Sequence, residues 1–131
     1  MTTGTRKTLS IGKEQSMSDG YDLINEMNDL CSKLTIAGKQ MAKYGKEFAE
    51  AEKNYKICLR EEALKLRTSQ DMPVTLIDKV VYGVPEVAEK RFNRDVAETM
   101  YKTAQEAINT LKLKIRILDS QISREWQGNV R

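Results

Sequence analysis

The stretch DMPVTLIDKVVYGVP, residues 71–85, separates two long helical patterns and decides how the chain folds. Residues that precede Pro73 are pushed out of helical geometry, so the first pattern must end here. Pro85 suits the first turn of a new helix, because its missing N–H would have no helical partner there. The stretch is therefore the point at which the chain turns back.

The residues between the two helical patterns are typical of a short helix with its own start and end. Asp71 is a candidate cap and Gly83 a candidate stop. A β-strand is the alternative, since four branched residues also suit one: Val74, Ile77, Val80 and Val81. A lone strand would have no partner, so we expect a helical tip over residues 71–84.

On both sides of the tip, apolar residues recur every three or four positions, which indicates a heptad pattern on long helices. The first set predicts a helix over 20–68 and comprises Leu23, Met27, Leu30, Leu34, Ala37, Met41, Tyr44, Phe48, Ala51, Tyr55 and Cys58. It then shifts, as at a stutter, to Leu59, Ala63 and Leu66. The second predicts a helix over 85–126 and comprises Val87 or Ala88, Ala97, Tyr101, Ala104, Ile108, Leu111, Ile115, Leu118, Ile122 and Trp126.

These helices predict an all-α fold, a long antiparallel hairpin of coiled-coil type with a short helical tip. Folding about residues 76 and 77 sets Tyr55 opposite Ala97, Phe48 opposite Ala104, Met41 opposite Leu111, Leu34 opposite Leu118, and Met27 opposite Trp126 as an aromatic plug at the open end. Large residues thus meet small ones near the tip, as interdigitated packing requires. We expect a disordered N-terminal arm over 1–17, a hairpin domain over 18–127 and a tail over 128–131.

Several apolar residues lie outside these two patterns. Ile36, Leu113 and Ile117 cannot all point into one hairpin interface. A hairpin has only one buried face per helix, so we expect a second packing surface, most simply self-association into a helical bundle.

The composition argues against catalysis. There is no histidine among 131 residues, so the chain has no Ser-His or Cys-His pair and lacks the commonest metal ligand. We expect no enzyme activity, no metal and no cofactor. Cys31 and Cys58 would lie about 40 Å apart on one straight helix, too far for a bridge. With no apolar run long enough for a membrane span, we expect a cytoplasmic protein without membrane contact.

Two glycines stand in the first predicted helix, where each costs roughly 1 kcal/mol. Gly38 and Gly45 form a stripe of small residues with Ala42 and Ala49 beside the heptad pattern. Such stripes let another helix approach closely, so the stripe is a candidate contact between subunits or with a partner. A kink at Gly38 or Gly45 is the alternative.

The basic residues are candidates for binding an anion, either single-stranded nucleic acid or a nucleotide. They gather near the tip and in a segment, 107–118, that has no acid. The candidates are Arg60, Arg67, Lys90, Arg91, Arg94, Lys112, Lys114 and Arg116. The alternative is that their long side chains flank and cover the helix interface, among interspersed glutamates.

Residues 73–126 resemble small all-helical accessory proteins encoded by phages and prophages of Gram-positive bacteria. The resemblance implies a protein of the bacterial host cytoplasm that binds host factors, binds nucleic acid or blunts host defences. We therefore expect an interaction protein that self-associates and binds a host or phage protein. An anion-binding protein and a structural scaffold are the alternatives.

Overall fold

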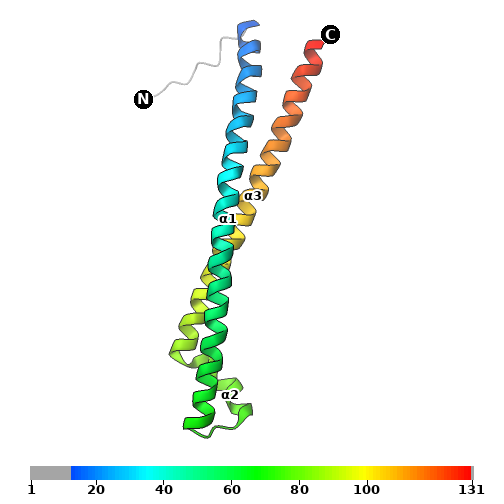
Figure 1. Cartoon of the computed structure of the whole chain (residues 1–131). Helices are drawn as coiled ribbons and strands as arrows, with labels where there is room; N and C mark the ends of the chain where they lie inside the picture. Colours follow the sequence, from blue (N-terminus) through cyan, green and yellow to red (C-terminus); the bar gives the residue numbers. More distant parts are fainter. Residues whose placement is uncertain (1–12, 131) are drawn as a thin grey trace, which may run out of the picture. The chain divides into compact units, whose positions relative to one another are not determined.

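Three α-helices and a short 3-10 segment make up the computed structural model, which describes residues 13–130. The helices are α1 (Lys13–Ser69), α2 (Val74–Val80) and α3 (Pro85–Val130), with the 3-10 segment η2 (Val81–Gly83) between α2 and α3 (Figure 1). Within these residues there is no strand. The predicted all-α helical hairpin with a helical tip is confirmed, since α1 packs against α3.

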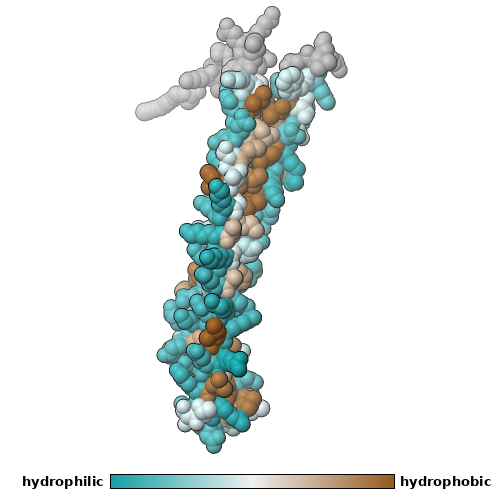
Figure 2. All heavy atoms as spheres, in the orientation of Figure 1, coloured by the Kyte–Doolittle hydropathy of each residue, from teal (hydrophilic) through white to brown (hydrophobic). Residues whose placement is uncertain are grey.

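The two heptad patterns form the interface between α1 and α3. Every member of the first set is buried or half-buried, and so is every member of the second set from Val87 to Ile122 except the alternative Ala88, which is exposed. Figure 2 shows hydrophobic side chains gathered between the two helices toward their N- and C-terminal ends. Leu59, Ala63 and Leu66 are also half-buried, as the predicted stutter requires.

The chain divides into two compact units, each of which is a segment of α1 beside a segment of α3. The tip unit comprises residues 37–107 and includes α2 and η2. The terminal unit comprises, among the described residues, 13–36 of α1 and 108–130 of α3.

The tip unit holds the main buried cluster of the described residues. It consists of Tyr55, Ile77, Val81 and Val87, the last with none of its surface exposed. Around it pack half-buried residues of α1, of the loop and of the segment before α3: Cys58, Leu59, Ala63, Leu66, Met72 and Val84. The α2–η2 segment thus supplies two of the four buried side chains, which two helices alone could not bury.

The turn at the tip differs in detail from the expectation. Asp71 does not cap α2: its φ of 50° is left-handed, and Pro73 occupies the N-cap position without a side-chain hydrogen bond. The left-handed residue follows the end of α1, where the Met72 amide donates to the Leu66 carbonyl at 3.3 Å. Asp71 thus takes the place that glycine or asparagine usually fills after a helix.

The helix ends also differ from the predicted ones. α1 begins at Lys13, so residues 13–17 of the expected arm are helical, while residues 1–12 lie outside the described part. α3 continues through Gly128 to Val130, so the predicted helix end at residue 126 was wrong and most of the expected tail is helical. Trp126 is 62% exposed and does not act as a plug.

The predicted register of the hairpin was wrong by about one helical turn. The ring of Phe48 lies 6.0 Å from that of Tyr101, three residues before the expected Ala104. Arg94 lies over the ring of Tyr55, three residues before the expected Ala97. The prediction placed the fold-back at the middle of the tip, whereas α1 extends to Ser69 and α2 packs against its last turns.

Candidate interaction surfaces

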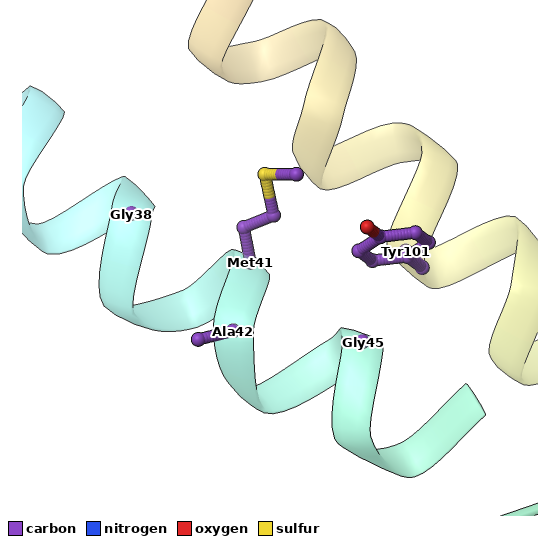
Figure 3. Close-up of a pocket in the computed structure, with 5 residues that line it drawn as sticks. All are labelled: Gly38, Met41, Ala42, Gly45 and Tyr101. Carbon is purple, nitrogen blue, oxygen red and sulfur yellow. The ribbon is translucent and has the colours of Figure 1, made fainter. Parts of the chain in front are cut away.

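The glycine stripe borders a depression of about 440 Å³ in the tip unit. Its lining residues are Gly38, Met41, Ala42, Gly45 and Tyr101 (Figure 3). In Figure 3 the side chains of Met41 and Tyr101 project into the space between the helices, whereas Ala42 points away from α3. α1 runs through both glycines without interruption.

The two glycines have different surroundings. A Cβ atom on Gly45 would lie 3.0 Å from the Tyr101 ring, so this glycine already makes a close contact within the chain. A Cβ atom on Gly38 would meet nothing within 4 Å. Gly38, Ala42 and Ala49 are exposed. The stripe is therefore divided between a contact to α3 and an open surface.

Arg94 joins the two helices of the tip unit. Its Nη1 donates to Glu52 Oε1 at 3.1 Å and its Nε donates to Asp95 Oδ1 at 2.8 Å. Its guanidinium lies 4.7 Å from the centre of the Tyr55 ring. The hydrogen bond from Arg94, and then that from Lys56, holds the pKa of Glu52 below its ordinary value. The charge of Arg94 is thus used inside the hairpin.

The other basic candidates of the tip unit lie among acids or on the open surface. Lys90 lines a groove of about 330 Å³ whose other charged residues are Glu61, Glu62 and Glu86. Burial, and then the charge of Glu62, raises the pKa of the Cys58 thiol in the same groove. The guanidinium of Arg91 lies 5.8 Å from the Tyr82 ring centre, and Arg60 and Arg67 are exposed.

A second groove, which we call the terminal groove, lies between α1 and α3 in the terminal unit and has a volume of about 410 Å³. Its apolar lining comes from Leu30, Ile117 and Leu118. Its polar lining residues are Glu26, Asp29, Lys33, Lys114 and Gln121. Three basic candidates come from segment 107–118, which has no acid. Lys114 lines this groove, whereas Lys112 and Arg116 do not line it and are exposed.

The helical tip also presents apolar side chains to solvent. Four are exposed, and we call them the tip patch: Val74, Leu76, Val80 and Tyr82. Sequence reasoning treated Val74 and Val80 as parts of the short helix and missed this surface. The 3.6-residue period held part of the signal, because it places Leu76 and Tyr82 away from Ile77 and Val81, whereas Val74 falls on their side of the helix and is exposed all the same.

The described residues offer no arrangement for a metal ion. Among them no three cysteine, aspartate or glutamate side chains are grouped to hold one, and no buried side-chain N or O atom lacks a hydrogen-bond partner. None of the helices in this part of the chain is long and apolar enough to cross a membrane. Comparisons with protein-family models, with curated proteins and with solved structures found no match.

Proposed function

We propose that this chain is a non-enzymatic helical interaction protein that self-associates and binds a host or phage protein. One observation carries the proposal. Among the described residues, fifteen large hydrophobic side chains are exposed, whereas six hydrophobic side chains are buried. Where such side chains adjoin other apolar residues, as Ile117 adjoins Leu30 and Leu118 in the terminal groove, they are typical of a surface that another protein covers.

The distribution of these side chains supports two separate contacts. The terminal unit exposes Tyr21, Ile24, Ile36, Leu113, Ile117 and Trp126. The tip patch belongs to the other unit and is formed by a different element. We assign self-association to the terminal unit and the protein partner to the tip patch.

The proposal leaves out catalysis because the sequence has no histidine to activate a nucleophile. It favours a protein partner over an anion because Arg94 is already bound by two carboxylates and Lys90 shares its groove with three glutamates. The resemblance to phage accessory proteins suggests that the partner belongs to the bacterial host, with antagonism of host defence as the biological role.

The first experiment measures the mass of the full chain by light scattering at micromolar concentration, where we expect a discrete oligomer. The second compares proteins captured from a bacterial lysate by the wild type and by the double variant Val74→Glu, Val80→Glu. The control is Ile57→Glu, since Ile57 is 49% exposed, between Val74 at 57% and Val80 at 38%, but lies on α1. We expect a captured protein to be lost with the tip variant alone.

A monomer that captures nothing in a tip-dependent manner would contradict the proposal. Nucleic acid that co-purifies with the wild type and is released by salt would support the anion-binding alternative instead.

A further inference from the structure

We infer that the terminal groove is the site at which a second copy of this chain docks, with α1 of one copy lying on α3 of the other. The inference rests on the proposed self-association and specifies its surface and arrangement. The groove has an apolar floor, where Leu30 and Leu118 are buried, and Ile117 on its edge is 55% exposed.

The apolar side chains that the hairpin cannot bury continue this groove. Ile36 lies one heptad after Asp29, and Leu113 lies one helical turn before Ile117, so both fall on the side of the helix that faces the groove. Both are exposed. A surface of this kind, an apolar groove with aliphatic side chains along its edges, is what the helices of a bundle bury.

The charges beside the groove favour a second copy as the occupant. Its α1 edge carries Glu26, Asp29 and Lys33, and Asp22 lies one heptad before Asp29, which gives this edge two more acids than bases. Its α3 edge carries Lys114, and one heptad after Ile117 and Leu118 come Arg124 and Glu125, which gives this edge one more base than acids. One edge is therefore acidic and the other basic.

These unlike edges also determine the arrangement. A two-fold axis along the helices places the acidic α1 edge on the basic α3 edge of the partner, twice in one dimer. A two-fold axis across the helices would place acid on acid and base on base, which is unfavourable. The first arrangement makes each surface complementary to itself, as an isologous dimer requires, and yields a four-helix bundle.

A single substitution in the groove tests the surface. Ile117→Glu adds a charge at an exposed position, so the hairpin should still fold, which circular dichroism checks. We expect at least a tenfold increase in the dimer dissociation constant measured by analytical ultracentrifugation. Val74→Glu is the matched control, since Val74 is 57% exposed in the tip patch, and should leave the dissociation constant unchanged.

The outcomes separate this inference from the proposed function. A wild type that stays monomeric would overturn both the self-association and this site. An oligomer that Ile117→Glu does not weaken, or that Val74→Glu weakens equally, would overturn the groove as the contact and leave self-association standing.

Charge reversal tests the arrangement. Glu26→Lys with Asp29→Lys makes both edges basic, and Lys114→Glu with Arg124→Glu makes both acidic. If α1 lies on α3 of the partner, each variant alone should lose the dimer, and an equal mixture of the two should restore it as a heterodimer. In neither variant can one edge attract the other edge of an identical chain, so a dimer that forms only on mixing must pair the two different variants. A mixture that stays monomeric, or single variants that dimerise like the wild type, would overturn the arrangement.

Discussion

The tip unit and the terminal unit use the same two helices and bury different amounts of them. In the tip unit, α2 and η2 cover α1 and α3, and four side chains are buried together. Among residues 20–36 and 108–128 of the terminal unit, whose burial the structure describes, only Leu30 and Leu118 are buried and six large hydrophobic side chains are exposed. Two helices have one shared face, whereas a third element creates a core. The unit without that element is the one that we expect a second chain to complete.

Core truncation gives the largest expected difference between the units. Ile77→Ala should lower the free energy of unfolding by about 2–5 kcal/mol, because the side chain is 6% exposed within the buried cluster. Leu118→Ala should fall near the low end of that range in the monomer, because its surroundings open into the terminal groove. Urea denaturation monitored by circular dichroism measures both. If Leu118→Ala lowered the free energy of unfolding more than Ile77→Ala at a concentration where the chain is monomeric, the tip unit would not be the better packed of the two.

The two glycines sharpen the comparison of covered and open surface. Gly38→Ala should raise the free energy of unfolding by about 1 kcal/mol, the helix preference of alanine, because nothing opposes the new methyl group. Gly45→Ala should gain less or become destabilising, since the Tyr101 ring must move. Thermal denaturation of the two single variants measures the difference. Equal gains at both positions would show that the Tyr101 contact is not tight.

The left-handed residue at the end of α1 offers a smaller gain. Asp71→Gly should stabilise the tip unit by about 0.5–1 kcal/mol, because glycine adopts the left-handed region without steric cost. Gln70→Gly is the control, since that residue has an ordinary backbone and should lose stability. Hydrogen exchange of amides in α2 reports on the tip unit alone. Faster exchange in Asp71→Gly would contradict the expectation.

The smallest expected effect is the pH dependence of the bond between Glu52 and Arg94. The pKa of Glu52 is lowered in the folded chain, so its contribution to stability is present above its ordinary pKa of 4.5 and is lost as the pH falls through the folded value. The stability difference between wild type and Glu52→Gln should therefore be present at neutral pH and shrink below about pH 4.5. Urea midpoints across the pH range measure it. Glu47→Gln, an exposed change on the same helix, is the control for removing a carboxylate that makes no bond to Arg94.

The heptad spacing predicted the helices, their shared face and the stutter, because each depends on local apolar periodicity. It did not predict where α1 begins, because residues 13–16 are polar and carry no such period. The predicted register between α1 and α3 was wrong because it assumed that the chain folds back at the middle of the tip. The tip contains a helix that packs against α1, so the fold-back point is not at the middle of the tip sequence. The exposed Ile36, Leu113 and Ile117 were correctly placed outside the hairpin interface. The terminal groove could not be predicted, because it depends on how α1 and α3 lie side by side.

The sequence does not show which charged residues of the candidate sites are paired with one another across the hairpin. It grouped Arg94 with the candidate anion-binding residues, but the contacts of Arg94 to Glu52 and Tyr55 depend on the register across the hairpin. The small-residue stripe was visible in the sequence, yet only the structure separates Gly45, in contact with Tyr101, from Gly38 on the open surface.

A repeating interface permits one helix to slide along the other by seven residues while apolar residues still meet apolar residues. The bond between Arg94 and Glu52 opposes such a slide. A slide of one heptad would bring Arg94 to Gly45 or to Leu59, neither of which has a side chain that accepts a hydrogen bond. It would also move the Tyr101 ring away from the space that Gly45 leaves for it. The ion pair and the Tyr101 contact together thus favour one alignment of the hairpin, as a single polar position does in a coiled coil.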